Sequence, residues 1–224
     1  MITIVPTRGR PENMVELIHT WNATTQVSHL LFAVDNDDPR LDEYKALFME
    51  HGQEGMYLEI GPRLRLGGTL NKMALKYIET YNVIGFMGDD HRPRTVGWDV
   101  QVLDAMMLLP KGSGFVYGND LNWGEGLPTS VFISSDIIET LGFMVPQGMI
   151  HLYFDNFWLD FGRALGRITY LPDVIIEHMH PSVGKAINDA GYQEVNAPEM
   201  FDHDRTVYEE YQRTQMIEDL LRCE

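Results

Sequence analysis

Short apolar runs alternate with amphipathic segments along residues 1–100. A short apolar run bounded by turn residues predicts a strand, and apolar side chains that recur every three to four positions predict a helix. The predicted strands are residues 1–6, 29–35, 57–60 and 82–87, and the predicted helices are residues 12–21, 41–51 and 69–81. Gly67 and Gly68 fall in the loop before the last of these helices. This alternation indicates βα units on a mostly parallel sheet.

The rest of the chain follows a less regular pattern. Helices are predicted over residues 97–109, 156–165 and 208–222, and a short one runs to Leu141 from a serine cap at Ser134 or Ser135. Strands are predicted over residues 115–117, 129–133, 168–171 and 174–177. Because no linker-like stretch separates these segments, we expect one α/β domain over residues 1–185 and an acidic extension over residues 186–224.

Composition narrows the class of protein. Apolar residues make up 44% of the 224-residue chain, which is enough for a packed core. The single cysteine, Cys223, can form no internal disulfide, so the fold needs no oxidising compartment. The N-terminal residues lack the features of a signal peptide, and no stretch approaches the roughly 20 apolar residues of a membrane span. We therefore expect a cytoplasmic protein.

The charge of the chain is unevenly distributed. A formal net charge of −16 disfavours bulk binding to nucleic acid, because phosphates must be neutralised by Lys and Arg. Several basic residues nevertheless lie in the N-terminal third: Arg8, Arg10, Arg63, Arg65 and Lys72. If the fold brings them together, they form a basic pocket for a small anionic ligand. The alternative is that the negative charge serves only to keep the surface soluble.

Three predicted strands are followed by polar or charged residues that are candidates for a functional site. The first runs into residues 6–10, the second into Asp35, and the fourth into Asp89 and Asp90. Ligands of open α/β sheets bind at these carboxyl ends. Paired carboxylates there suit Mg²⁺ or Mn²⁺, which can neutralise a diphosphate leaving group. Asp35 also lies in an ordinary turn sequence, Asp-Asn-Asp-Asp-Pro, so a structural role is equally open for it.

The order of these motifs resembles a known family. Pro-Thr-Arg-Gly-Arg at residues 6–10, an aspartate after the second strand, a helix that carries an asparagine, and a strand that runs into Asp-Asp occur in this order in GT-A glycosyltransferases of the family 2 type. The resemblance covers about residues 1–185. It implies a single Rossmann-like GT-A domain, with a mostly parallel central sheet flanked by helices and a C-terminal helical tail. Residues 1–100 then bind the nucleotide-sugar, and residues 101–185 bind the acceptor.

The resemblance also implies roles for residues of the donor half. It places Pro6, Thr7 and Arg8 at the nucleotide and Asp35 at the base or ribose. The segment that approaches the diphosphate and the donor sugar contains Arg65, Asn71 and Lys72. Asp89 falls on the metal-binding aspartate, and Asp90 is assigned to the donor. The sequence departs from the family at Met87, where an aspartate is common, so one ribose or metal contact depends on Asp90 or His91 instead.

In the acceptor half, the resemblance places Asp155 at the position of the catalytic base. The alternative is a helix cap, because the predicted helix begins at Asn156. Of the two histidines after the last strand, His178 is favoured over His180 as a metal ligand. The acceptor side is expected to include Asn119, Asp120 and Trp123, whereas the Trp-Asp pair at 98–99 is favoured as structural.

The resulting hypothesis is a metal-dependent, inverting glycosyltransferase that uses Mn²⁺ or Mg²⁺ and a nucleotide-sugar donor, with a UDP-sugar favoured. The acceptor stays open between a glycan, a protein, a small molecule and a modified nucleobase. Two other classes remain: a non-catalytic binder of nucleotide-sugars or glycans, and a nucleotidyltransferase. The oligomeric state and the role of the acidic extension are not readable from the sequence.

Overall fold

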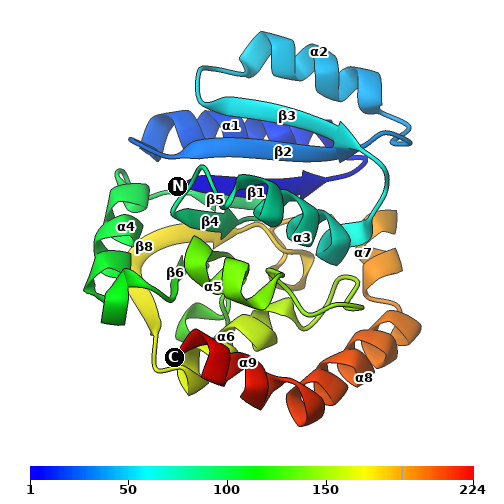
Figure 1. Ribbon diagram of the computed structural model, residues 1–224. Coiled ribbons are helices and arrows are strands. Elements are labelled where there is room, and N and C mark those ends of the chain that lie inside the picture. Colours follow the sequence, from blue (N-terminus) through cyan, green and yellow to red (C-terminus); the bar gives the residue numbers. More distant parts are fainter. Residues whose placement is uncertain (188) are drawn as a thin grey trace.

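A curled sheet of eight strands runs through the molecule (Figure 1) in the order β3-β2-β1-β4-β7-β6-β8-β5. The computed structural model describes residues 1–187 and 189–224. The strands are β1 (Ile2–Thr7), β2 (His29–Asp35), β3 (Met56–Gly61), β4 (Val83–Phe86), β5 (His91–Pro93), β6 (Phe115–Asn119), β7 (Val131–Ser134) and β8 (Ile168–His178). Strands β3, β2, β1 and β4 are parallel neighbours, and β6 is parallel to β8. The mostly parallel sheet is thus confirmed, with antiparallel pairs at β4–β7, β7–β6 and β8–β5.

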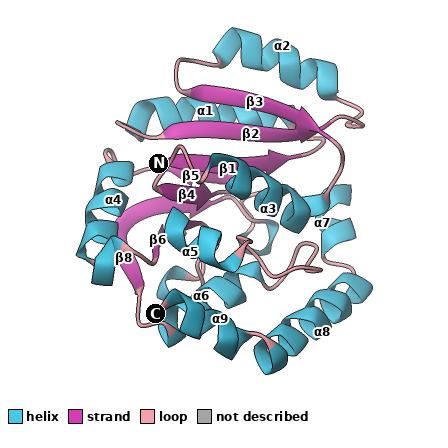
Figure 2. Ribbon diagram, viewed as in Figure 1, coloured by secondary structure: helices cyan, strands magenta, loops and turns pink. Residues whose placement is uncertain are grey.

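Helices cover both faces of this sheet (Figure 2). They are α1 (Pro11–Thr24), α2 (Leu41–His51), α3 (Arg65–Tyr77), α4 (Trp98–Leu108), α5 (Ser135–Leu141), α6 (Phe154–Ala164), α7 (Ala190–Val195), α8 (Pro198–Thr214) and α9 (Met216–Cys223). Successive residues of a strand point to opposite faces, so Ile4 joins one apolar cluster and Val5 the other. Helices α3, α5, α6 and α8 pack on the first face, and α1, α2 and α4 on the second. Within the described part of the chain, no helix is both long and apolar enough to cross a membrane.

The predicted start of α3 is wrong, because Gly67 and Gly68 were assigned to a loop. The helix begins at Arg65, and Gly67 and Gly68 lie in its first turn rather than in a loop. The backbone N–H of Gly67 donates to the carbonyl oxygen of Ile150 at 3.0 Å. A Cβ at Gly67 would overlap the carbonyl oxygen of Met149, so this glycine allows a close approach between α3 and the segment before α6.

Other boundaries also differ. Strand β5 was not predicted, because a three-residue strand that ends in Pro93 carries no alternating signal. The two strands expected over 168–177 form one continuous strand, β8. The single helix expected over 208–222 is divided into α8 and α9 at Gln215. Ser134 stands at the N-cap of α5, but its Oγ accepts from Gly114 N at 2.9 Å and does not cap the helix.

The structural role favoured for the Trp-Asp pair is confirmed. Trp98 is fully buried between Trp21 and Phe132, and its indole N–H donates to Thr25. The Asp99 carboxylate accepts the backbone N–H groups of residues 26–28. This pair therefore joins the start of α4 to the loop between α1 and β2.

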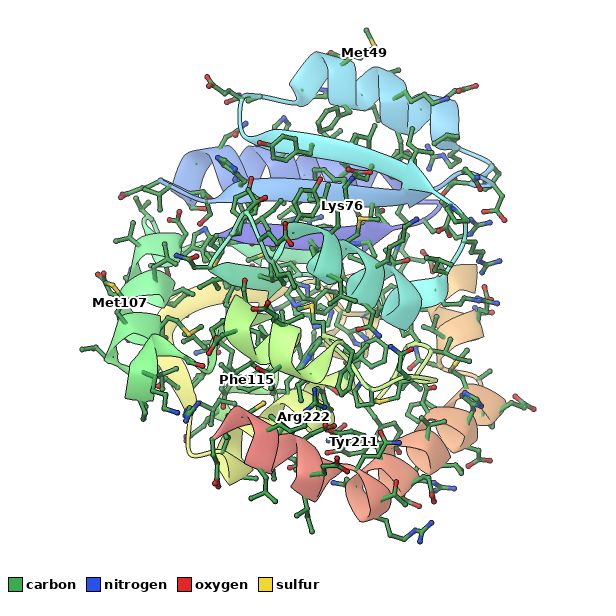
Figure 3. All side chains as sticks on the ribbon, viewed as in Figure 1. Met49, Lys76, Met107, Phe115, Tyr211 and Arg222 are labelled. Carbon is green, nitrogen blue, oxygen red and sulfur yellow. The ribbon has the colours of Figure 1, made fainter. Side chains whose placement is uncertain are left out.

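The acidic extension packs against the rest of the chain. Tyr208 and Tyr211 of α8 are buried in the first apolar cluster, and Figure 3 shows Tyr211 and Arg222 where α8 and α9 meet the domain. Asp204 of α8 is 0% exposed. Its carboxylate accepts the backbone N–H groups of residues 150–152 at 2.7–2.9 Å. The extension thereby fixes the loop that leads into α6.

We expect Asp204→Ala to lower the free energy of unfolding by on the order of 3 kcal/mol, because three backbone N–H groups lose their acceptor. Urea unfolding measures the change. Asp202→Ala, which removes an exposed carboxylate on the same helix, serves as the control and should alter stability by less than about 0.5 kcal/mol. Equal effects of the two substitutions would contradict this role of Asp204.

Candidate active site

The paired aspartates after β4 face different partners. Asp89 is 1% exposed and accepts from Thr7 Oγ1 at 2.7 Å and from Asn13 Nδ2 at 3.3 Å. Arg10 Nη2 lies 3.3 Å from the same carboxylate. Burial raises the pKa of Asp89, while the charge of Arg10 acts to lower it. Asp89 is therefore held by residues of β1 and α1.

Asp90 turns instead toward two histidines. Its carboxylate oxygens lie 3.4 Å from His178 Nε2 and 3.4 Å from His91 Nδ1. The antiparallel register of β5 and β8 places His91 directly opposite His178. Burial alone acts to raise the pKa of Asp90, but its contact with His178 holds this pKa well below the ordinary value. Asp90 is thus an ionised carboxylate beside two imidazoles.

The two imidazoles have different surroundings. Their rings stack with centroids 4.2 Å apart. His91 Nδ1 accepts from the backbone N–H of Gly88 at 3.0 Å, and Nε2 lies 3.4 Å from Thr129 Oγ1. Burial, followed by the charge of His178, lowers the pKa of His91, so this ring is neutral with its proton on Nε2. His178 Nδ1 is buried without a hydrogen-bond partner among the described residues, and its Nε2 faces Asp90.

These residues fit a divalent cation. One ligand atom each from Asp90, His91 and His178 lies within 4.8 Å of the other two. A carboxylate with imidazole nitrogens suits Mn²⁺ and similar ions. Both nitrogens of His91 already have partners, so Asp90 and His178 are the better placed donors. The structure brings Asp90, rather than Asp89, to His178, and metal binding by Asp89 stays a prediction.

Met87 belongs to the core. Its side chain is fully buried in the second apolar cluster, with Val5 and Met14 among its members. The side chain therefore points away from Asp90 and takes no part in a polar site. Where the resembling family commonly has an aspartate, this chain has a methionine that packs in the core.

The residues expected at the nucleoside lie at the ends of β1, β2 and β3. Arg8 Nη1 is 3.0 Å from the Asp35 carboxylate, and Arg63 Nε is 3.9 Å from it. Burial raises the pKa of Asp35, against the lowering effect of Arg8. Asp35 and Lys72 line the same small cavity. Pro6 and Thr7 end β1 at this edge, so the structure gathers these predicted residues on one side of Asp89.

Asn71 lies apart from the residues at the ends of β1, β2 and β3. It is buried, its Nδ2 donates to the carbonyl of Val145 at 2.9 Å, and its Oδ1 accepts the backbone N–H groups of Met144 and Val145. The predicted donor contact of Asn71 is replaced by this link between α3 and the segment before α6. Arg65, six positions earlier on the exposed start of the helix, is free of such contacts and pairs with Glu194 of α7.

Asp155 lies in the first turn of α6. The helix begins at Phe154, and Tyr153 holds the N-cap position with a φ of 65°, so the capping role considered for Asp155 is wrong. One carboxylate oxygen accepts the backbone N–H of Asn156 at 2.9 Å. Burial raises the pKa of Asp155 to about 6. A carboxyl that titrates near neutral pH is suited to proton transfer.

The loop at 119–124 is built around Asp120. This buried carboxylate accepts the backbone N–H groups of residues 122–124 through Oδ1 and the Thr129 hydroxyl through Oδ2. The Asn119 side chain likewise bonds the backbone of Leu121 and Pro172. These two predicted acceptor residues therefore hold the loop, whereas Trp123 presents an indole that is 63% exposed.

The same loop is tied to the two stacked histidines. His178 N donates to the carbonyl of Asp120 at 3.0 Å, and Asn122 Nδ2 donates to the carbonyl of His178 at 3.0 Å. Thr129 links the Asp120 carboxylate to the ring of His91. Asp120 thus positions both the exposed Trp123 and the stacked imidazoles.

A cavity of about 410 Å³ opens beside Asp90, between α1, β5 and residues of the segments 179–187 and 189–192. Its lining includes Arg10, Arg92 and Tyr192. This volume lies within the range of small-molecule sites, roughly 300–1,000 Å³. The position, at the carboxyl end of β4, is where ligands of open α/β sheets bind.

No protein-family model matches the sequence, and no curated protein matches it in sequence. Solved structures do match its fold. The mannosyltransferase PcManGT from Pyrobaculum calidifontis, in complex with GDP-Man and Mn²⁺, aligns with 99% of this chain and 72% of its own at a TM-score of 0.65 and 14% identity. S. aureus TarS 1-349 in complex with UDP aligns with 98% of this chain and 79% of its own at a TM-score of 0.60 and 11% identity. The chain has the GT-A glycosyltransferase fold.

Within this GT-A fold, three contributors to the site escaped sequence reasoning. Tyr192 lies far along the chain in a polar segment, and its hydroxyl donates to Asp90. Tyr44 of α2 bonds Thr7 Oγ1 at 2.8 Å and the backbone N–H of Arg10 at 2.8 Å. Arg10 was noted for its charge, but its contact with Asp89 depends on how β1 meets β4. No local pattern marks any of these contacts.

We expect ¹⁵N NMR of the imidazoles to find His91 neutral, with its proton on Nε2. Because burial lowers its pKa, the ring should become charged only at a lower pH than an ordinary histidine, whose pKa is about 6.5. A His91→Gln spectrum assigns the signal. A proton on Nδ1, or titration at the ordinary pH, would contradict the bond from Gly88.

Proposed function

We propose that this protein is a metal-dependent glycosyltransferase that moves a sugar from a nucleoside-diphosphate sugar to an acceptor with inversion. The observation that carries the proposal is the buried Asp90 carboxylate 3.4 Å from His178 Nε2 at the carboxyl end of β4 in a GT-A fold. The GDP-Man, UDP and UDP-GlcNAc complexes of the structural neighbours support a nucleotide-sugar donor. We favour a UDP-sugar.

Asp90 and His178 would hold the Mn²⁺ or Mg²⁺ ion. When bound, the ion neutralises charge that develops on the diphosphate as it leaves. Arg8, which pairs with Asp35, is assigned to the nucleoside together with Pro6 and Thr7 at the end of β1. Arg65 and Lys72 are assigned to the phosphates. Asp89 then acts through Arg10 and Thr7, which it holds at the edge of the site.

Asp155 is assigned as the general base. It takes the proton of the acceptor nucleophile while that atom forms a bond to the anomeric carbon and the bond from this carbon to the diphosphate oxygen breaks. Its raised pKa favours this task, because a base that titrates near the working pH accepts a proton readily. The acceptor would approach from the side of Trp123, where an exposed indole can stack on a sugar or base.

We expect one nucleotide-sugar of a panel to raise the melting temperature only with Mn²⁺ or Mg²⁺, and to release its nucleoside diphosphate when an acceptor is present. Asp90→Ala should abolish the metal-dependent shift, whereas Asp89→Ala should keep metal binding and weaken the donor about tenfold by loosening Arg10.

Asp104→Ala, which changes an exposed residue of α4, is the control for these variants. Donor binding without turnover would favour a non-catalytic binder. Pyrophosphate release from a nucleoside triphosphate would favour a nucleotidyltransferase. If Asp89→Ala, and not Asp90→Ala, abolishes the metal dependence, our choice of ligand is wrong.

We expect Asp155→Asn to lower kcat by about 10²–10⁴-fold while donor affinity is unchanged. In the wild type kcat should rise with pH through about 6, because Asp155 must be ionised to accept a proton. Asp160→Asn is the matched control, since this carboxylate of α6 bonds Tyr208 instead. A wild-type profile that is flat between about pH 5 and 7 would exclude Asp155 as the base.

A further inference from the structure

Helix α7 lies over the candidate site and contacts its charged residues with two side chains. The Tyr192 hydroxyl donates to the Asp90 carboxylate, on the oxygen that also faces His178. The Tyr192 ring lies 5.0 Å from the guanidinium of Arg10 and meets the His180 ring edge-on. Tyr192 thus covers the carboxylate that we assign to the metal.

The second side chain is Glu194, two residues after Tyr192 and therefore on a different side of the short helix. Its carboxylate bonds Arg63 Nη2 at 3.2 Å and also pairs with Arg65 Nη1. These arginines lie between β3 and the start of α3, at the same edge of the sheet as Asp35, and Figure 1 shows α7 beside this edge. A carboxylate held by two guanidinium groups resembles a bound phosphate, because both are oxyanions that accept hydrogen bonds from arginine.

We propose that α7 is an internal pseudo-ligand of the donor site. Glu194 occupies an anion-binding position that Arg63 and Arg65 form for a phosphate group of the donor, and Tyr192 occupies the position of the cation at Asp90. This inference rests on the proposed function and adds two elements to it. Arg63 becomes a donor-binding residue, and donor and cation must expel α7 before they bind.

The contacts that hold α7 are of a kind that a ligand can displace. The helix has six residues, well short of the roughly 12–15 at which an isolated helix becomes even marginally stable. Asp189 caps it by accepting the backbone N–H of Tyr192 at 2.9 Å. The ion pairs of Glu194 are about half exposed, and such pairs are weak. A diphosphate carries more negative charge than one carboxylate and therefore competes favourably for the same arginines.

An opposite role for α7 makes a different prediction. If Tyr192 and Glu194 completed the site and closed over a bound ligand, their removal would weaken binding. If they occupy the places of the ligand, their removal must strengthen binding, because the ligand no longer displaces them. The sign of the change in affinity therefore separates the two roles.

The test measures binding of Mn²⁺ alone, and of inorganic pyrophosphate in the presence of Mn²⁺, by titration calorimetry on the full chain. We expect Tyr192→Phe to bind Mn²⁺ roughly three- to tenfold more tightly than wild type, and Glu194→Gln to bind pyrophosphate more tightly by a similar factor. Glu199→Gln, an exposed first-turn substitution in the next helix, should bind both probes like wild type.

Hydrogen exchange of residues 189–195 provides a second readout in the wild type. Exchange should become faster when Mn²⁺ and pyrophosphate are added, because α7 leaves its site. Slower exchange, weaker or unchanged binding by both variants, or no binding of either probe by any variant would overturn the proposal. Failure of the proposed function is seen separately: no nucleotide-sugar is turned over, while the order of probe affinities among the variants still decides the role of α7.

Discussion

Two adjacent carboxylates buried at the end of one strand need separate partners, and this constraint organises the site. Burial penalises each charge unless a cation or a hydrogen-bond donor compensates it. Asp89 takes its partners from β1 and α1, through Thr7 and Asn13, and from Arg10 between them. Asp90 faces His178 of β8, beside the stacked ring of His91 of β5. The pair therefore connects the parallel half of the sheet to its antiparallel edge and leaves an ionised carboxylate where the two meet.

A chain of hydrogen bonds connects the histidines beside Asp90 to the loop at residues 119–124. His91 is fixed by Gly88 and Thr129, and Thr129 is held by Asp120, which also shapes the loop that carries Trp123. The exposed loop is thus linked to the stacked imidazoles through the side chains of Asp120 and Thr129. Such outer contacts commonly orient the side chains that bind a metal.

The acidic extension both builds the site and covers it. Asp204 orders the backbone before α6, where Asp155 lies, while Tyr192 contacts Asp90 and Glu194 pairs with Arg63. Its negative charge is therefore not spread uniformly over a solvated tail. One of its carboxylates accepts hydrogen bonds from buried amides, and another pairs with two arginines.

The sequence by itself determined the order of βα units over residues 1–100, because helix and strand periods are local properties of the chain. It also placed Asp35, Asp89 and Asp90 at one edge, because parallel strands bring their carboxyl ends together. Only the tertiary structure decided that Asp90 meets His178, since this depends on the register of β5 against β8. The contact of Tyr192 with Asp90 was likewise beyond any local pattern, because it joins segments that only the packed fold brings together.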